Sequence, residues 1–309
     1  MKNYNSIIIV GPTASGKTRL ATHLANTLNG AVLSFDSRQV YQELNIGTGK
    51  DLDEYLIENK PIPYYLINEC DVNSNFHSYE FVKSYIHASK QCELNKHVPI
   101  LCGGTGLYID LALKQHQYIN IPVNEILRLE IQDQSENELI TLLQNYKPAF
   151  TQQADKSTKK RLIRAIEIAD YLSKNSHQKI EYPDLKPIIF GIELKSSVRN
   201  KQIDKRLKQR LENGLIEEVE QLLVKGIKPE RLIFLGLEYK FITEYLQGKF
   251  NKEEMINLLQ TAIHQYAKRQ MTWFRKMERE GNLIHWIDGN LTTAAQIQSI
   301  QKIISALET

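Results

Sequence analysis

The sequence is short of cysteine and of long apolar runs, and both absences exclude classes of protein. Three cysteines occur among 309 residues, with no CxxC pair. A disulfide framework or a zinc site would therefore lack its ligands, and we expect three reduced thiols. The first apolar segment, residues 7–10, is too short for a signal peptide or a membrane span. The sequence predicts a cytoplasmic protein with no membrane partner.

The chain also lacks internal repeats, low-complexity linkers and a strong net charge. The formal net charge is +3, with 42% hydrophobic and 24% charged residues, which is ordinary for a globular protein. A chain of this length can bury a core without crosslinks. The overall charge is too mild to indicate a nucleic-acid partner, so the distribution of charge has to be considered.

Apolar segments alternate with helical patterns along the first third of the chain. Residues 6–10, 31–35 and 98–102 read as short buried strands, whereas residues 17–28 and 79–94 have a helical pattern. Strands that alternate with helices indicate a parallel sheet covered on both faces. The expected fold class is therefore α/β.

The pattern changes after about residue 113. Residues 124–175 are helical and strongly charged, with no strand candidate, and residues 188–194 then restore a strand. Helices dominate from there to residue 277, before a last strand at 283–287 and a closing helix. The simplest account is a helical insertion in a sheet core, with core segments at 1–115 and 186–309 and the insertion at 116–185.

A phosphate-binding loop follows the first strand. Residues 11–18 read G-P-T-A-S-G-K-T and match G-x-x-x-x-G-K-[ST] between a strand and a helix, which is the context the motif requires. Backbone N–H groups and the helix N-terminus would hold phosphate oxygens, and the threonine hydroxyl would bind Mg²⁺. The sequence therefore predicts a P-loop NTPase-like core whose phosphate-binding residues are Gly11, Pro12, Thr13, Ala14, Ser15, Gly16, Lys17 and Thr18.

The loop alone does not choose a reaction, because hydrolases, small-molecule kinases and other diphosphate-using enzymes share it. The strand at 98–102 ends in Gly-Gly-Thr rather than a carboxylate, which argues against an ATPase motor or a GTPase switch. Asp36 follows the second strand and Thr105 the third. Strand ends of an open parallel sheet meet at one crevice, so Asp36 is a candidate general base or hydroxyl ligand beside the loop.

Basic residues gather in three stretches of the sequence. Each run taken alone is typical of a solvated helix face, but three together begin to resemble a track for a phosphodiester backbone. The runs lie within residues 156–164, 195–210 and 268–279.

Four motifs together make the sequence similar to the tRNA dimethylallyltransferases, also called tRNA isopentenyltransferases. They are G-P-T-A-S-G-K-T, D-S-R-Q-V-Y with I-G-T-G-K, G-G-T-G-L-Y, and Y-A-K-R-Q-M-T-W-F-R, at residues 11–18, 36–50, 103–108 and 266–275. The first alone is generic, whereas the second and fourth together are specific to the family. The resemblance implies transfer of a dimethylallyl group from dimethylallyl diphosphate to N6 of the adenosine 3′ of a tRNA anticodon.

The resemblance also assigns roles to residues. Asp36 would accept a proton from the amine, Thr105 would orient that amine, and Lys17, Arg206 and Mg²⁺ on Thr18 would neutralise the leaving diphosphate. The insertion would hold the anticodon stem-loop. The predicted tRNA-binding residues are Asp36, Ser37, Arg38, Gln39, Thr105, Arg128, Lys160, Arg161, Leu162, Ile163, Arg164, Lys268 and Arg269.

Three other functions stay open on the sequence alone: a prenyltransferase acting on free adenine nucleotides, a P-loop small-molecule kinase that binds ATP, and an inactive RNA-binding module. The basic insertion argues against the first, and the long C-terminal Ala-Lys-Arg-Gln segment against the second. Joint retention of the candidate catalytic residues argues against the third. Gln202 and His264 depart from arginines that are frequent in the family. A monomer is expected.

Overall fold

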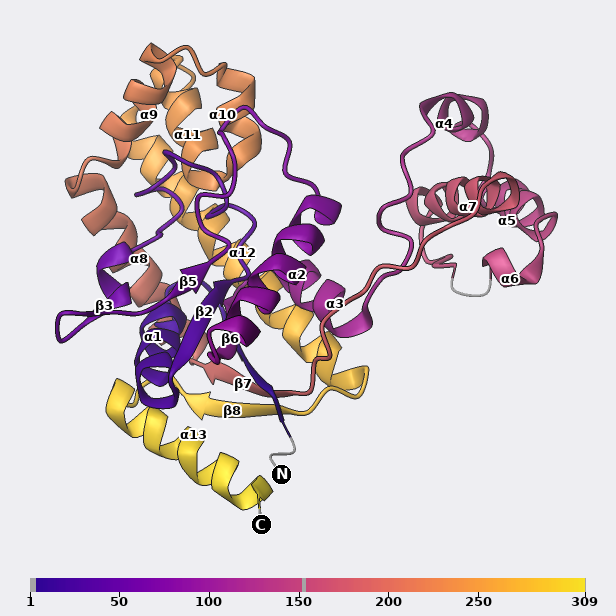
Figure 1. The fold of residues 1–309 in the computed structure, drawn as a ribbon. Helices are drawn as coiled ribbons and strands as arrows, with labels where there is room; N and C mark the ends of the chain where they lie inside the picture. The colour runs from indigo at the N-terminus through magenta and orange to yellow at the C-terminus, as the bar shows by residue number, and fades with distance from the viewer. Residues whose placement is uncertain (1–3, 152–153, 309) are drawn as a thin grey trace. The chain divides into compact units, whose positions relative to one another are not determined.

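The computed structural model describes residues 4–151 and 154–308. It separates into two compact units, one formed by Met1–Lys114 with Pro183–Thr309 and the other by Gln115–Tyr182. The second unit is thus a continuous insertion in the first, which the sequence predicted at 116–185. Figure 1 shows the two units as a ribbon coloured along the chain.

A six-stranded parallel sheet forms the centre of the first unit. Its order is β5-β2-β6-β1-β7-β8, and each neighbouring pair is parallel. Strand β1 pairs with β6 and β7, and Val10 lies opposite Gly103 on one side and Gly191 on the other. The strands are β1 Ser6–Val10, β2 Gly30–Ser34, β5 Tyr64–Tyr65, β6 Val98–Gly103, β7 Pro187–Glu193 and β8 Ile284–Asp288.

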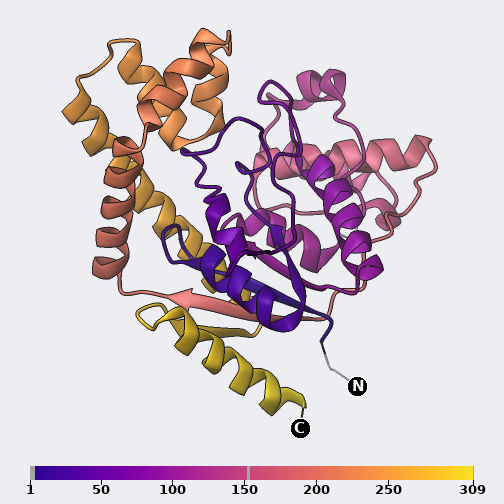
Figure 2. The ribbon, with the colours of Figure 1, turned by 60° about the vertical axis from the view of Figure 1, so that its left-hand side comes forward.

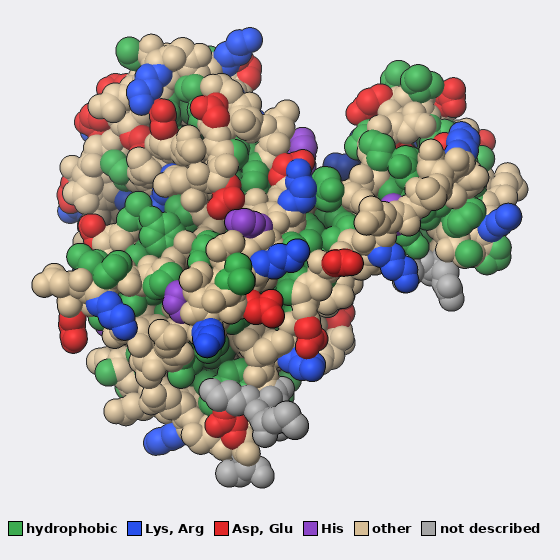
Figure 3. Space-filling model, in the orientation of Figure 1, with side chains coloured by type: hydrophobic (Ala, Val, Ile, Leu, Met, Phe, Trp, Pro, Cys, Tyr) green, Lys and Arg blue, Asp and Glu red, His purple; other side chains and the backbone are tan. Residues whose placement is uncertain are grey.

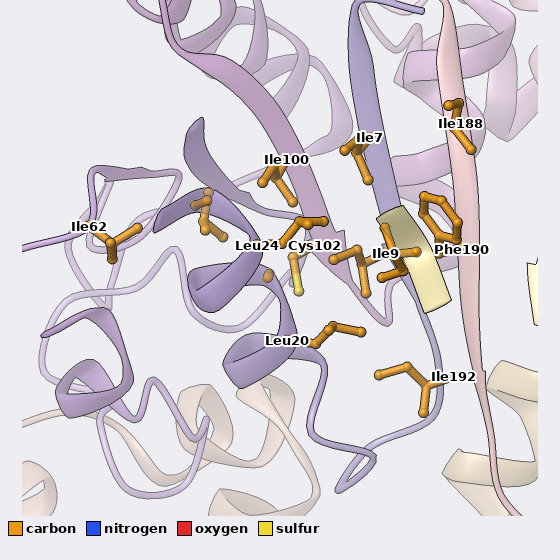
Figure 4. Packing of buried hydrophobic residues seen from close by; sticks show 14 of the residues in the cluster. Ile7, Ile9, Leu20, Leu24, Ile62, Ile100, Cys102, Ile188, Phe190 and Ile192 are labelled. Atoms are coloured by element: carbon orange, nitrogen blue, oxygen red, sulfur yellow. The ribbon is translucent and has the colours of Figure 1, made fainter. Parts of the chain in front are cut away.

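Side chains that alternate along the strands bury both faces of the sheet. On one face Ile9, Cys102 and Phe190 pack with Leu20 and Leu24 of α1 (Lys17–Leu28), as Figure 4 shows. Helix α13 (Thr293–Glu308) packs beside α1 and β8 on the same face (Figure 2). On the other face α2 (Ser78–Leu94) packs against β2 and β6, and α3 (Gly106–Lys114) packs against α2.

Five helices follow β7 and form a second core within the first unit. The helices are α8 Ser196–Glu212, α9 Leu215–Val224, α10 Pro229–Leu235, α11 Leu237–Leu246 and α12 Lys252–Arg279. Buried side chains of all five pack with Val40, Tyr41 and Leu44 from the segment after β2. This shared core fixes residues 36–50 against α8 and α11, which is how these helices come to line the site.

The second unit consists of four helices with a small core of their own. They are α4 Glu125–Ile131, α5 Glu136–Gln144, α6 Pro148–Thr151 and α7 Lys159–Lys174. Leu139 and Leu143 of α5 pack against Leu162 and Ile166 of α7. Ser135 and Glu138 form a capping box that satisfies backbone donors at the start of α5. As expected, the described residues of this unit contain no strand.

The sequence missed the smallest elements. Strand β5 and the hairpin of β3 (Leu56–Ile57) and β4 (Lys60–Pro61) each have two residues per strand, too few for a periodic signal. A short 3₁₀ helix, η1, spans Leu52–Tyr55. The three cysteines are free thiols. Among the described residues, no helix is both long and apolar enough to cross a membrane.

Candidate active site

A cavity of about 390 Å³ lies at the carboxyl ends of the central strands. Its walls come from the turns after β1, β2 and β6 and from helices α8, α10, α11 and α12. Lys17, Thr18, Asp36 and Arg206 all line it, so residues far apart in the sequence share one chamber. This is where ligands bind in open parallel sheets.

The loop at residues 11–18 has the backbone of an anion-binding turn. Ala14 and Gly16 adopt positive φ angles of 60° and 80°, which aim successive N–H groups into one concavity. A Cβ atom on Gly11 would lie 2.9 Å from the Ser15 hydroxyl oxygen. That hydroxyl is buried and has no hydrogen-bond partner among the described residues. A phosphate oxygen would satisfy it.

Two partly buried cations, Lys17 and Arg206, flank the loop. Lys17 Nζ donates a hydrogen bond of 2.7 Å to the backbone oxygen of Pro12. Burial lowers the pKa of Lys17 to about 8, and nearby Arg206 contributes in the same direction. Arg206 on α8 donates to the Thr13 hydroxyl, and burial lowers the pKa of its guanidinium to about 10. An anionic ligand beside them would favour the charged form of both groups.

Asp36 and Thr105 lie at the ends of adjacent strands, β2 and β6. Asp36 lines the cavity, and its Oδ1 accepts a hydrogen bond of 2.9 Å from the Arg38 backbone N–H. The Thr105 hydroxyl accepts from the Ser37 backbone N–H at 3.1 Å. The Thr105 hydroxyl therefore links the turn after β6 to the turn after β2. It binds the backbone of Ser37, the residue next to the one that carries the carboxylate.

Gln270 is a site residue that sequence reasoning missed. Its Oε1 accepts from the Thr13 backbone N–H at 2.8 Å, and its Nε2 donates to the Gly104 backbone oxygen at 3.0 Å. A Cβ atom on Gly104 would lie 2.1 Å from Gln270 Nε2. The side chain thus joins the phosphate loop to the turn after β6. The motif Y-A-K-R-Q marks this stretch of the sequence, but the motif alone does not show which of its side chains points to the phosphate loop.

The two aromatic residues of the same motif, Trp273 and Phe274, take different positions. Phe274 is fully buried, as a core residue would be. Trp273 packs on the turn after β6, because a Cβ atom on Gly106 would lie 2.2 Å from Trp273 Cδ1. Helix α12 therefore contacts that turn through both an amide and an indole.

Residues 39–50 form a braced wall of the cavity. Gln39 is buried; its Oε1 accepts from the Ser34 hydroxyl at 2.8 Å and its Nε2 donates to the Gly49 oxygen at 3.0 Å. The Glu218 carboxylate accepts from the Asn45, Ile46 and Gly47 backbone N–H groups and from the Tyr239 hydroxyl, at 2.7–3.1 Å. Both polar atoms of the Gln39 side chain therefore bind other protein groups, and we do not assign it a direct contact with tRNA.

Arg210 and Glu238 are a second pair that the sequence did not identify. An Arg210 guanidinium nitrogen lies 3.8 Å from a Glu238 carboxylate oxygen, and both residues line the cavity. Arg210 is one helical turn after Arg206 on α8. Burial raises the pKa of the Glu238 carboxyl. Gly49 has a φ of 62°, which favours glycine, and its missing side chain leaves the Arg210 guanidinium room to lie against the backbone.

In the second unit, two of the predicted RNA-binding arginines have internal partners. Arg128 makes hydrogen bonds of 2.8 and 3.0 Å to Glu167, whose side chain is fully buried. Arg164 donates to the Ile121 oxygen at 2.6 Å and contacts Glu167 at 3.3 Å. Leu162 belongs to the core of this unit. These three side chains hold the unit together, so we do not assign them a direct contact with RNA.

Other predicted RNA residues are on the surface. Lys160 and Arg161 are exposed on α7, and Arg161 forms an ion pair of 2.8 Å with Asp155. Ile163 is partly buried against the core of the unit. Lys268 and Arg269 are exposed on α12, and Arg269 also lines the cavity. On the face shown in Figure 3, basic side chains lie among acidic ones.

The residues present fit a magnesium ion bound through a ligand. The described residues contain no cluster of three His, Cys, Asp or Glu side chains that could hold a metal. Thr18 lines the cavity at the first turn of α1. Mg²⁺ commonly takes one or two protein oxygens, several waters and substrate phosphates, and one hydroxyl beside an anion site satisfies that requirement.

The sheet, the loop and the insertion define a P-loop-like α/β enzyme with an inserted helical unit. A family model described as IPP transferase matches residues 39–277. A tRNA dimethylallyltransferase 2 of Bacteroides fragilis is 44% identical over 98% of both chains. A tRNA dimethylallyltransferase 1 of Azobacteroides pseudotrichonymphae is 47% identical over 93% of this chain and 94% of that one.

Solved structures agree with this relationship. The full-length tRNA isopentenylpyrophosphate transferase of Bacillus halodurans superposes with a TM-score of 0.71, at 29% identity over 98% of this chain and 96% of that one. A eukaryotic dimethylallyltransferase described as acting on tRNA shares the fold, with a TM-score of 0.67 at 21% identity over 97% of this chain and 77% of that one. The chain belongs to the IPP transferase family, whose relatives here are tRNA dimethylallyltransferases.

Proposed function

We propose that this enzyme transfers a dimethylallyl group from dimethylallyl diphosphate to N6 of an unstacked adenosine next to a tRNA anticodon. The observation that carries the proposal is the shared cavity. It joins an anion-binding loop with two partly buried cations, Lys17 and Arg206, to the carboxylate of Asp36. The family relationship then selects a prenyl diphosphate and a tRNA among the ligands that such a site can take.

The donor's diphosphate occupies the loop at residues 11–18 in this proposal. The Ser15 hydroxyl and the loop N–H groups bind phosphate oxygens, and Lys17 and Arg206 neutralise charge as diphosphate leaves. Mg²⁺ held by Thr18 would supply further neutralisation of that leaving group. These contacts stabilise the departing diphosphate, which is where negative charge develops in the transition state.

Asp36 acts on the acceptor. An exocyclic adenine amine is a weak nucleophile because its lone pair is delocalised into the ring. As the N6–carbon bond forms and the carbon–oxygen bond to diphosphate breaks, Asp36 takes the proton from N6. A positioned carboxylate contributes typically ~10²–10⁴-fold to such a step. Thr105 holds the turn that carries Asp36 through its bond to Ser37.

The acceptor has to leave its stack to reach the cavity, as do other bases that enzymes modify. Single-stranded loops are where RNA bases are accessible for such recognition. We propose that Ser37, Arg38 and Arg269 contact the extruded nucleotide. Lys160, Arg161, Ile163 and Lys268 would contact the stem-loop outside the cavity.

The direct test is incubation with dimethylallyl diphosphate, Mg²⁺ and an adenosine-containing anticodon stem-loop, followed by mass analysis of the RNA. We expect prenylated RNA and released diphosphate. AMP, ADP and ATP tested as acceptors examine the free-nucleotide alternative, and ATP tested as a phosphoryl donor examines the kinase alternative. Modification of free nucleotides in preference to RNA, or phosphorylation without a prenyl donor, would reject the proposal.

A further inference from the structure

Phe234 is an exposed aromatic side chain at the cavity. It belongs to the short helix α10, lines the chamber and has 62% of its surface exposed. Neighbouring members of α10, Leu232 and Leu235, are fully buried. The helix therefore has its core contacts without Phe234, whose exposed ring forms part of the cavity wall.

An anchored arginine supports the Phe234 ring. The Arg231 guanidinium lies 5.6 Å from the centroid of that ring and 5.4 Å from that of Tyr41. Arg231 Nε donates to the Val72 backbone oxygen at 2.7 Å, and another of its nitrogens donates to the Ser74 oxygen. Because these carbonyls fix the guanidinium, the ring rests against a rigid and positively charged support.

A second arginine lies at the same ring without another partner. The Arg38 guanidinium is 5.6 Å from the Phe234 centroid. Its side chain forms no hydrogen bond or ion pair with the part of the chain that the structure describes. Arg38 also lines the cavity, two residues from Asp36. An aromatic ring and a free guanidinium thus stand together where RNA would enter.

We propose that Phe234 and Arg38 form a stacking site for a second unstacked nucleobase, a direct neighbour of the adenosine that enters the cavity. This inference rests on the proposed function. Aromatic rings and arginine planes are the groups on which proteins stack single-stranded bases. An isoprenoid chain would favour an enclosed apolar pocket, whereas this ring is exposed and flanked by cations. The occupant is therefore a base of the RNA rather than the prenyl group.

Substitutions at Phe234 separate stacking from apolar contact. Phe234→Leu keeps an apolar side chain and removes the ring, whereas Phe234→Tyr keeps the ring. We expect Phe234→Leu to weaken stem-loop binding roughly 10-fold, within the range for loss of one base–aromatic stack, and Phe234→Tyr to bind like wild type. The affinity for dimethylallyl diphosphate should be the same in all three. Leu94→Ala, at a 74%-exposed position on α2, is the control for a surface substitution.

Salt dependence provides a second readout. Phe234→Leu should leave the slope of log affinity against log salt unchanged, whereas Arg38→Ala should reduce it by about 0.7, the value for one contact with single-stranded RNA. Stem-loops with 2-aminopurine 5′ or 3′ of the target adenosine should show quenching at one of these positions in wild type and Phe234→Tyr, and not in Phe234→Leu.

Equal stem-loop affinity and equal quenching in wild type and Phe234→Leu would overturn the inference. So would a loss confined to donor affinity, because that result would place the prenyl group against the ring. Prenylation by the wild-type protein is measured with the same RNA. A failure of the stacking site with that activity intact is therefore distinct from a failure of the proposed function.

Discussion

The cations of the cavity and those of the second unit are the same residue types in different surroundings. Lys17 and Arg206 are partly buried beside the anion-binding loop, and desolvation lowers the pKa of both. Arg128 and Arg164 in the second unit instead neutralise one buried carboxylate, Glu167. A basic residue that neutralises a buried carboxylate is thus occupied inside the fold, and a run of charges in the sequence does not show this.

The largest expected effect is at Asp36. Asp36→Asn retains the acceptor for the Arg38 N–H but cannot take a proton from an amine. We expect turnover to fall by ~10²–10⁴-fold, with stem-loop affinity within about 3-fold of wild type as judged from the small effect of an isosteric change. Single-turnover kinetics and equilibrium binding check the two parts. Asp53→Asn, at an exposed acid on η1, is the matched control; a similar loss in turnover there would remove the special role of Asp36.

Gln270→Ala should have the next largest effect. It leaves the Thr13 N–H and the Gly104 oxygen without partners inside the protein, which costs about 1–3 kcal/mol in the free energy of unfolding. The Michaelis constant for the donor should also rise, because the phosphate loop loses its brace. Urea denaturation and steady-state kinetics measure these effects. Gln265→Ala, on the exposed side of the same helix, should change neither; unchanged donor kinetics in Gln270→Ala would contradict the bracing role.

Donor affinity should depend on pH through Lys17. Its free-enzyme pKa is about 8 because burial lowers it, and the protonated form binds diphosphate. Above pH 8 the affinity should therefore fall by about tenfold per pH unit, while below pH 8 this group adds no dependence. Lys17→Arg keeps its charge across this range and should give a flatter profile between pH 7.5 and 9.5. Calorimetric titration measures both; parallel profiles would show that another group titrates.

The smallest effects are expected in the second unit, where they distinguish an exposed arginine from one with internal partners. Arg161→Ala should weaken stem-loop binding a few-fold and lower the salt slope by about 0.7–0.9. Arg164→Ala should mainly destabilise the unit, by about 1–3 kcal/mol, because it leaves Glu167 and a backbone oxygen with fewer partners. Filter binding over a salt series and chemical denaturation separate the two. Equal salt slopes for Arg161→Ala and wild type would exclude Arg161 from the RNA contact.

Sequence patterns predicted the sheet core because its signals are local. Apolar runs indicate strands β1 and β6 and helix α1, and glycine spacing indicates the loop at residues 11–18. Parallel topology then brings Asp36 to Lys17, since both follow the carboxyl ends of strands. These parts required no knowledge of long-range contacts.

The remainder of the site depends on contacts between distant segments. Gln270 reaches Thr13 across 257 positions, and Glu218 reaches Ile46 across 172. Nothing in the helical pattern of α9 or α12 distinguishes these side chains from solvated polar residues. The basic run predicts that Arg164 binds RNA, whereas its side chain bonds to the Ile121 backbone oxygen inside the unit.

The central claim is that the cavity holds a prenyl diphosphate, with Asp36 directed at the acceptor. Calorimetric titration of the wild-type protein with dimethylallyl diphosphate and, separately, with ATP, each with Mg²⁺, tests the first part most directly. We expect tighter binding of dimethylallyl diphosphate, with the affinity lost in Lys17→Ala and kept in Asp36→Asn. Tighter binding of ATP, or donor affinity that survives Lys17→Ala, would contradict it.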